Sequence, residues 1–415
     1  MKKLFTFIAV ICLALNASAQ YQVTNNTFEG SWVNCYPWEK GAKVNSAYGE
    51  TPTGWCVSNV PNSAMPKVAK QIQGPSGNAV KLSNVDVMGQ VAPGYITLGT
   101  TWATAETLLT NVRNADGGSF GGVAFTHHPD AVQIKYQRDN SNGTERASLV
   151  AYLWRGSWSQ ADVPSNTAVG YLVYGTATKV TMTDRDRNIL GIETILGGQV
   201  TPSPDAELIA SVQSYITTAT SDWTTLTAEL EYASDSDPTM INIIVSATDY
   251  FADRSGITSG NSISLDDVIL LYYSELASAK YDGNAITFNG TSASLDVYYD
   301  KFDKDALAVT SNGHGASVVV GNVVENQGVH TVTITINGEN ISEEPNNHHE
   351  YTITLKEYGR GDVNKDGSVT IADVTALVNI ILGKGGDDDM ADVNDDGGVT
   401  IADVTALVNI ILGKN

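Results

Sequence analysis

The sequence predicts a mainly β, multi-domain chain that ends in a short α-helical region. Short apolar or alternating runs recur from Tyr21 onward, separated by clusters of Gly, Asn, Asp and Pro, a pattern typical of antiparallel β-sandwiches. This pattern ends near residue 357. A 23-residue segment then occurs twice, as Asp362–Lys384 and Asp392–Lys414. Both copies carry apolar residues at helical spacing, so the C-terminal region is expected to be α-helical.

The first 19 residues have the pattern of a secretory signal. Lys2 and Lys3 form a basic end, Leu4–Leu15 an apolar core, and Ala17–Ala19 a small-residue cleavage site. No later segment approaches 18 continuous apolar residues. We therefore expect a secreted protein, periplasmic, on the cell surface or extracellular, that does not insert into a membrane after the signal is removed.

Residues 20–276 are predicted to form one large jelly-roll-like β-sandwich. Its clearest strand signals are the runs Ser148–Trp154, Thr224–Tyr232, Met240–Ala247 and Val268–Tyr273. One segment, Asp205–Ile216, is instead expected to form a short helix with Asp205 as its N-cap.

Residues 277–357 are predicted to form a small immunoglobulin-like β-sandwich that serves as a spacer. Its strand signals are Ser294–Tyr298, Ala316–Val320, Thr331–Ile336 and Tyr351–Leu355. Within the third run, Val332, Ile334 and Ile336 are expected to face the core, because side chains alternate between the two faces of a strand.

Residues 358–415 place a 12-residue loop before each predicted helix. Such a loop supplies calcium with oxygen ligands from positions 1, 3, 5, 7, 9 and 12, and a Gly at position 6 makes the sharp turn. Both copies fill every position, with Gly367 and Gly397 at the turn. The expected ligands are Asp362, Asn364, Asp366, the Ser368 carbonyl, Thr370 and Asp373, and then Asp392, Asn394, Asp396, the Gly398 carbonyl, Thr400 and Asp403. We therefore predict that this region binds two Ca²⁺ ions.

Two such loops in tandem, each with Asp at position 12 and only an exit helix, resemble the type I dockerin family over residues 361–415. The resemblance implies that the two calcium-stabilised helices bind a cohesin-like module of another protein through residues 371–384 and 401–414. Positions 10 and 11 are Ile and Ala in both copies, where many dockerins carry Ser/Thr pairs, so the identity of the partner does not carry over. A calcium clip that orders the tail without binding a protein is the alternative.

The net charge of −22 disfavours nucleic acid and anionic membranes as partners, because both require a basic surface. It also argues against strongly acidic polysaccharides. Cys35 and Cys56 remain after signal removal, and export makes a disulfide between them chemically possible. Two buried thiols are the alternative.

The N-terminal region resembles jelly-roll carbohydrate-binding modules at both of its ends. An N-x-x-F-E stretch ends at Glu29, and an Asp-Asp-Val strand begins at Asp266. Between them, Gly121–Pro129 and Ala147–Trp154 resemble the carbohydrate-metabolism domain of secreted glycan-utilisation proteins, abbreviated PCMD. Pairing of the first and last strands implies that Glu29 approaches Asp266, where repelling carboxylates would favour a structural calcium ion.

A glycan is the ligand that this resemblance implies, and aromatic residues in loops are candidates for stacking on sugar rings. These candidates are Trp38, Trp55 and Trp158, although core packing is the commoner role of a Trp.

One acid–base group, consisting of His127, His128 and Tyr136 with Lys135 and Arg138, would suit a polysaccharide lyase or esterase. A His-His-Pro turn beside a strand is more often structural. The sequence thus predicts a glycan-binding protein with a docking tail, and a glycan-active enzyme, either a glycoside hydrolase or a polysaccharide lyase, is the alternative. An adhesin without a glycan role is a third interpretation.

Overall fold

The structure is a computed structural model of the 415-residue chain. It describes residues 21–34, 49–59, 66–108, 111–140, 144–156, 171–173, 206–252, 256–385 and 389–414. The chain divides into two compact units. Unit 1 runs to Tyr273 and also includes the short segments Gly313–Gly315 and Gly338–Asn347, and unit 2 contains Ser274–Asn312, Ala316–Asn337 and the residues from His348 onward. The expected signal, residues 1–19, lies outside the described residues.

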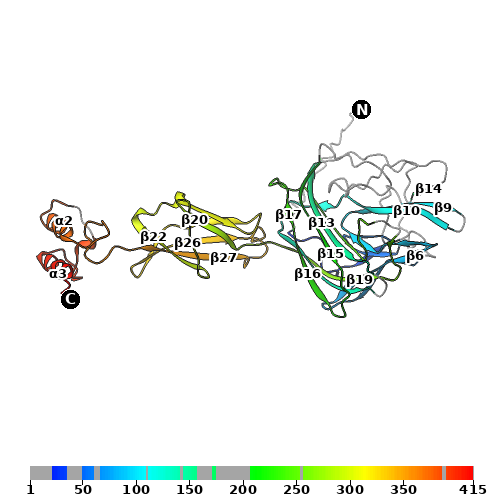
Figure 1. Ribbon diagram of the computed structural model, residues 1–415, viewed down its shortest axis with the longest axis horizontal. Coiled ribbons are helices and arrows are strands. Elements are labelled where there is room, and N and C mark those ends of the chain that lie inside the picture. The colour runs from blue at the N-terminus through cyan, green and yellow to red at the C-terminus, as the bar shows by residue number, and fades with distance from the viewer. Residues whose placement is uncertain are drawn as a thin grey trace, which may run out of the picture. The chain divides into compact units, whose positions relative to one another are not determined.

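The predicted fold class is confirmed: the chain is mainly β, with a jelly-roll-like sandwich, a small immunoglobulin-like sandwich and a C-terminal helical region (Figure 1). The division into four segments at residues 19, 276 and 357 stays a prediction. None of the helices in the described ranges is long and apolar enough to cross a membrane.

Unit 1 is built on two antiparallel sheets. The seven-stranded sheet has the order β17 (Glu231–Tyr232), β15 (Ala206–Ile216), β13 (Ala147–Gly156), β18 (Met240–Ser246), β8 (Tyr95–Thr97) and β3 (Cys56–Val57), with β11 (Val123–Ala124) also paired to β18. The five-stranded sheet has the order β16 (Thr224–Glu229), β12 (Ala131–Asp139), β19 (Ser262–Leu271), β5 (Asn78–Ser83) and β4 (Ala69–Gln73).

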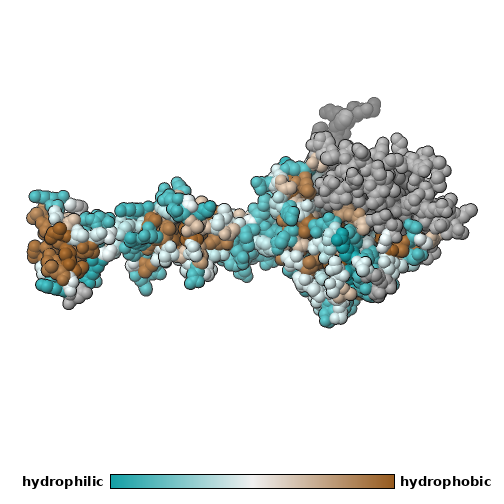
Figure 2. All heavy atoms as spheres, viewed as in Figure 1, coloured by the Kyte–Doolittle hydropathy of each residue, from teal (hydrophilic) through white to brown (hydrophobic). Residues whose placement is uncertain are grey.

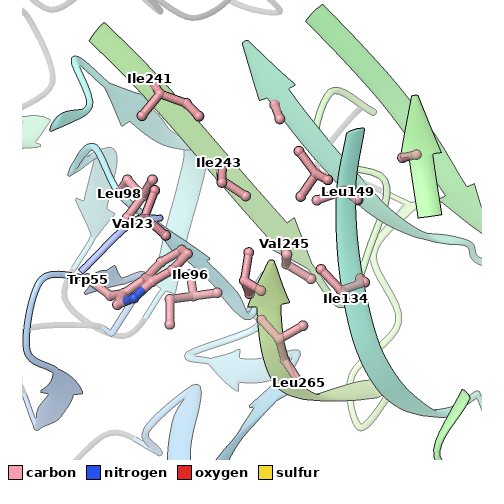
Figure 3. Packing of buried hydrophobic residues seen from close by; sticks show 14 of the residues in the cluster. Val23, Trp55, Ile96, Leu98, Ile134, Leu149, Ile241, Ile243, Val245 and Leu265 are labelled. Carbon is pink, nitrogen blue, oxygen red and sulfur yellow. The ribbon is translucent and has the colours of Figure 1, made fainter. Parts of the chain in front are cut away.

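The core of unit 1 lies between these two sheets, as Figure 3 shows. Leu149, Ile243 and Val245 extend from the seven-stranded sheet, and Ile134 and Leu265 extend toward them from the five-stranded sheet. All five side chains are fully buried. Burial of a side chain of this size contributes about 1.5–3 kcal/mol, so this layer is the main source of stability for the unit.

The other face of the seven-stranded sheet is covered as well. A second cluster of buried residues there includes Tyr95, Tyr152, Trp154 and Tyr250. Every residue of β13 from Ala147 to Trp154 is therefore buried. A strand that is buried on both faces shows a continuous apolar run instead of alternation, which explains the sequence of β13.

Three smaller pairings complete the described part of unit 1. A three-stranded sheet contains β10 (Asn111–Phe120), β9 (Thr100–Leu108) and β14 (Tyr171–Val173). Two further pairs are β1 (Trp32–Asn34) with β2 (Glu50–Pro52), and β6 (Val85–Val87) with β7 (Gln90–Ala92).

The helix expected over Asp205–Ile216 is wrong, because Ala206–Ile216 forms the strand β15. Asp205 itself lies outside the described residues. β15 pairs with β13 along its whole length, from Ala147↔Ile216 to Gly156↔Ala206, with a register shift between Leu153 and Trp154. Helix propensity is a weak preference of a few tenths of a kcal/mol per residue, and pairing in the middle of a sheet overrides it here.

The β part of unit 2 packs a five-stranded sheet against a three-stranded sheet. The larger sheet has the order β22 (Ser292–Tyr298), β27 (His348–Lys356), β26 (Val329–Asn337) and β24 (Ser317–Val320), with β25 (Val324–Asn326) also on β26. The smaller sheet contains β21 (Asn284–Ala285), β20 (Leu276–Tyr281) and β23 (Leu307–Ser311). Val332, Ile334 and Ile336 are fully buried in the core, as their alternation with threonines predicts.

The C-terminal part of unit 2 contains α2 (Ile371–Ile381) and α3 (Ile401–Ile411). Short 3₁₀ turns cover Tyr299–Lys301, Lys304–Ala306 and Asp389–Ala391. The two helices share a small core in which Val363, Leu377, Val393 and Leu407 are buried. Each copy of the duplicated segment contributes two of these residues.

Candidate functional site

The loop before α2 is held by its own side chains. The Asp362 carboxylate accepts hydrogen bonds from the backbone N–H groups of Asp366 at 3.0 Å and Gly367 at 2.9 Å. The Asp373 carboxylate accepts from the N–H groups of Asn364 at 3.0 Å and Thr370 at 2.7 Å. The first and twelfth residues of the loop therefore fix its backbone from both ends. Gly367 has φ +90°, which an L-residue with a side chain adopts only under strain.

The loop before α3 repeats these contacts. The Asp392 carboxylate accepts from Asp396 at 3.1 Å and Gly397 at 2.8 Å, and the Asp403 carboxylate accepts from Asn394 at 3.0 Å and Thr400 at 2.7 Å. The turn residue again has a positive φ, +88°. The duplicated sequence thus gives a duplicated structure at the level of single hydrogen bonds.

The donor set of these loops suits a hard cation. Asp362 is 1% exposed and Asp373 and Asp403 are fully buried. Across the ranges that the structure describes, none of the Asp side chains expected as ligands forms an ion pair with Lys, Arg or His. A buried carboxylate without a cationic partner is costly, and a divalent cation with oxygen ligands would provide that partner.

Three of the six expected ligands in each loop are Asp side chains. In the described part of the chain, no three His, Cys, Asp or Glu side chains converge closely enough to hold a metal ion. What fits calcium here is the identity of the donors and the backbone conformation of the loop.

Each helix begins directly at its loop. Thr370 caps α2 by accepting a hydrogen bond from the Ala372 N–H, and it forms a capping box with Asp373. Thr400 and Asp403 repeat this arrangement at α3. Such a cap contributes about 1 kcal/mol. Asp373 and Asp403 therefore connect loop and helix, so a change in either loop reaches the start of its helix.

The two helices leave apolar side chains in solvent. Ile371 and Ile401 are each 72% exposed, and Leu382 and Leu412 are 60% and 58% exposed. Figure 2 shows the apolar side chains gathered over α2 and α3. Clustered exposed apolar surface is uncommon on a monomer and often marks an interaction site.

In unit 1, the two carboxylates expected to bind calcium, Glu29 and Asp266, contact other groups. Glu29 accepts hydrogen bonds from the Asn78 backbone N–H at 2.7 Å and from its side-chain amide at 3.3 Å. Asp266 is fully buried, and burial followed by repulsion from Asp267 raises its pKa. Lys135 donates to Asp267 at 2.5 Å. This ammonium group supplies a positive charge that sequence reasoning did not foresee, and a calcium ion at Glu29 and Asp266 stays a prediction.

The candidate acid–base residues are separated. His127 and His128 each place Nδ1 3.3 Å from Oε1 of Glu339, and Tyr21 stacks on the His127 ring at 3.9 Å. Tyr136 lies further along β12 and packs against the core. Five residues separate it from the start of that strand, or roughly 17 Å of extended chain.

The histidines instead belong to a hydrogen-bonded cluster within unit 1. Glu339 also accepts from the His128 backbone N–H at 2.5 Å, and Asp130 accepts from the His314 backbone N–H at 2.7 Å. Tyr232 stacks on the His314 ring at 3.6 Å. Sequence reasoning missed Glu339 and His314 because they lie about 200 residues from the histidines that they contact, and no local pattern indicates the pairing.

The remaining site candidates fall in different places. Trp55 is 3% exposed, and its indole donates to the backbone carbonyls of Thr24 and Asn25, so it packs in the core instead of facing a ligand. Trp38, Trp158 and Cys35 lie outside the described residues. Cys56 is half-buried in β3, and its pairing with Cys35 stays a prediction.

Residues 360–412 match the family model described as the dockerin type I domain. The match covers the two loops, α2 and α3, and it confirms the resemblance of the C-terminal region. It does not extend to the rest of the chain, and the proposed resemblance to PCMD stays untested. The chain has no match among curated proteins.

Several solved structures resemble the chain weakly. Two are provisionally described as glycoside hydrolases, from Bacteroides vulgatus (16% identity, 49% of this chain and 77% of that one, TM-score 0.31) and Bacteroides thetaiotaomicron (15%, 62% and 72%, TM-score 0.34). A third is a carbohydrate-binding module specific for non-crystalline cellulose (11%, 58% and 98%, TM-score 0.24). TM-scores this low carry no argument about fold or activity.

Proposed function

We propose that this chain is a secreted glycan-utilisation protein. Its C-terminal dockerin region takes up two Ca²⁺ ions and docks to a cohesin-like module of another protein, while the sandwich of unit 1 binds a glycan. The observation that carries the docking proposal is the pair of exposed isoleucines, Ile371 and Ile401, at equivalent places in the dockerin match.

Calcium would act by ordering the loops. The residues that would hold it are the ones expected from the loop positions, among which the Asp362, Asp373 and Asp403 carboxylates are buried and Asp392 is half-buried. Calcium bound there supplies positive charge to each loop. Because Asp373 and Asp403 also cap the helices, calcium that fixes these two carboxylates in place would also fix the start of each helix.

The helices would then present their apolar side chains to the partner. The exposed fractions of Ile371 and Ile401 are equal, so both copies offer the same anchor. Burial of a large aliphatic side chain contributes about 1.5–3 kcal/mol, and anchors of this kind dominate interface energies. The small core between the helices uses other residues, chiefly Leu377 and Leu407, so the anchors lie outside it.

The glycan role rests on unit 1. The two sequence stretches that resemble the ends of carbohydrate-binding modules lie side by side, since the Val268 N–H donates to the Asn26 carbonyl at 2.7 Å. The acidic balance of the chain favours a ligand without strong negative charge.

Docking is tested with an immobilised type I cohesin. The wild-type protein is expected to bind in calcium and to be released by a chelator. The double variant Ile371→Lys/Ile401→Lys is expected to lose binding by at least tenfold. The matched control Val319→Lys/Val324→Lys replaces two exposed valines of the unit 2 sheet and should bind normally. Binding that survives the isoleucine replacements would reject this surface, and calcium-independent binding would reject the mechanism.

The glycan role is tested by affinity electrophoresis on soluble polysaccharides, with reducing ends and unsaturated products measured in parallel. Retardation without product formation supports a binding protein. Release of oligosaccharides by the pure protein would instead establish the enzyme alternative, and absence of retardation on every glycan would favour an adhesin.

A further inference from the structure

A polar hollow of about 480 Å³ lies on unit 1, on the outer face of the five-stranded sheet. Its lining comes from three strands and from the segment after β15, and consists of Lys81, Gln137, Arg138, Asp139, Asn140, Ala219, Thr220, Ser221, Ser262 and Ser264. Its volume falls within the usual range of small-molecule sites, about 300–1,000 Å³. None of the lining residues belongs to the candidates taken from the sequence except Arg138.

The register of the sheet assembles the floor of this hollow. Gln137 on β12 lies opposite Ser264 on β19, and Ser264 lies opposite Lys81 on β5. In the next row, Asp139 lies opposite Ser262. Ile263 and Leu265 face the core, so the alternating Ser262 and Ser264 face outward into the hollow.

The floor offers both donors and acceptors. Lys81 contributes an ammonium group and Asp139 a carboxylate. Within the described ranges, the hydroxyls of Ser262 and Ser264 make no hydrogen bond. The Gln137 amide nitrogen donates to the Ser221 carbonyl at 2.5 Å, which leaves its oxygen as an acceptor.

Two polar atoms of lining residues lack a partner among the described residues, and both are closed to solvent. One is the donor Nε of Arg138, and the other is the acceptor Oδ1 of Asn140. Arg138 is 1% exposed, and its two Nη atoms donate to the carbonyls of Ile216 and Glu145. Arg138 lies opposite Ile263, whose side chain faces the core, so the Arg138 side chain points to the core side of the sheet and neither atom is a contact for a ligand in the hollow.

A sugar hydroxyl can accept from Lys81 and donate to Asp139, whereas a carboxylate or sulfate can only accept. An anionic ligand could accept from Lys81, but it would face the Asp139 carboxylate. The lining has no aromatic residue, so recognition here depends on hydroxyl groups and not on stacking against a ring face.

We propose that this hollow is the glycan-binding site of unit 1, and that it takes one or two uncharged, hydroxyl-rich sugar units of a glycan. The inference rests on the proposed glycan role of unit 1. It adds the location, the ligand class and the residues: Lys81, Ser262 and Ser264 bind hydroxyls from the floor, and Asp139 accepts from them.

The test uses the full chain and a panel of xylan, arabinan, galactan, mannan, β-glucan and starch, with polygalacturonate as the charged member. Affinities are measured by titration calorimetry for the wild type, Ser264→Val and Lys81→Met. Each replacement is expected to lower the affinity for the glycan at least tenfold. Thr225→Val, on the same sheet, and Lys280→Met, in unit 2, are matched controls that should bind as the wild type. Thermal unfolding identifies any variant that fails to fold, and Lys81→Met retains the test if Ser264→Val does not fold, since Lys81 is only half-buried.

The outcomes separate this inference from the proposed function. A glycan bound equally by the wild type and both variants would overturn the hollow as its site while leaving the glycan role in place. Failure of the whole panel to bind would overturn both. Binding of polygalacturonate alone would overturn the uncharged ligand class.

Discussion

At the scale of single residues, the polar groups of unit 1 are placed by contacts distant in sequence. Asn242, fully buried beside Tyr152, shows this most clearly. Its side-chain oxygen accepts from Thr97 at 2.8 Å and from the Gly99 N–H at 2.9 Å, while its nitrogen donates to Ser119 and Tyr152 at 3.1 and 3.0 Å. A satisfied buried network of this kind favours one packing arrangement over others.

Replacing Asn242 by Leu should therefore destabilise unit 1. The change removes four hydrogen bonds and leaves their partners buried without a substitute, at a cost of about 2–4 kcal/mol. Thermal unfolding of the full chain measures this as a lower midpoint for the unit 1 transition. Asn289→Leu, in unit 2, serves as the control, and an unchanged midpoint for Asn242→Leu would show that the network contributes no net stability.

The contact between His128 and Glu339 should make the stability of unit 1 depend on pH. The hydrogen bond to Glu339, opposed by burial, raises the pKa of His128 above its usual 6.5. A raised histidine pKa contributes stability that is fully present below about 6.5 and is lost as pH rises through the folded-state pKa. Burial would raise the pKa of Glu339, but hydrogen bonds from the His128 side chain and backbone outweigh this and lower it. The stability that Glu339 contributes is thus fully present above about pH 4.5 and is lost as pH falls through its lowered pKa.

Glu339→Gln should accordingly destabilise unit 1 by about 1–2 kcal/mol between pH 5 and 6.5 and by less at pH 8.5. Denaturant unfolding of the wild type and of Glu339→Gln, at one pH within this range and at pH 8.5, measures the difference in the free energy of unfolding. Asp130 also titrates in this region, since burial raises its pKa to about 6, and it therefore has to remain unchanged in both proteins. A loss that is the same at both pH values would show that the charge on His128 is not involved.

At the scale of elements, the two calcium loops differ in charge despite their matching hydrogen bonds. Position 4 is Lys365 in the first loop and Asp395 in the second. Calcium affinity increases with the negative charge of the loop. We therefore expect the second loop to bind calcium more tightly than the first. Lys365→Asp should raise the affinity of the first loop on the order of tenfold, an effect of two charges near the ion. Titration calorimetry that shows two equal sites in the wild type, unchanged by Lys365→Asp, would contradict this.

The elements also show which patterns in the sequence suffice for prediction. The alternation of Thr331–Ile336 is local and is found as expected, and the local pattern from Asp362 to Asp373 lies within the dockerin match, while its calcium ligands stay a prediction. The error at β15 arose because Ala, Glu and Leu favour helix locally, whereas pairing with β13 decides the outcome. The hollow was not predictable, because the register that places Lys81 beside Ser264 and Gln137 joins residues up to 183 positions apart.

At the scale of the whole molecule, the α-helices of the described residues lie in the C-terminal region, next to the loops expected to bind calcium. The α-helices of the described residues, α2 and α3, both follow calcium loops. Chelation should therefore remove the helical circular dichroism signal while the β signal persists, because the two sandwiches have cores of their own. A helical signal that is unchanged in chelator would mean that the cap and the shared core order the helices without the ion.

The central claim is that the duplicated C-terminal loops take up calcium and thereby order a docking surface. Calcium titration of the full chain, compared with the double variant Asp373→Asn/Asp403→Asn, tests it most directly, because any site at Glu29 and Asp266 is common to both proteins. The account predicts that the wild type takes up two more Ca²⁺ ions than the variant and that only the wild type binds an immobilised cohesin. Equal calcium uptake by the two proteins would contradict it.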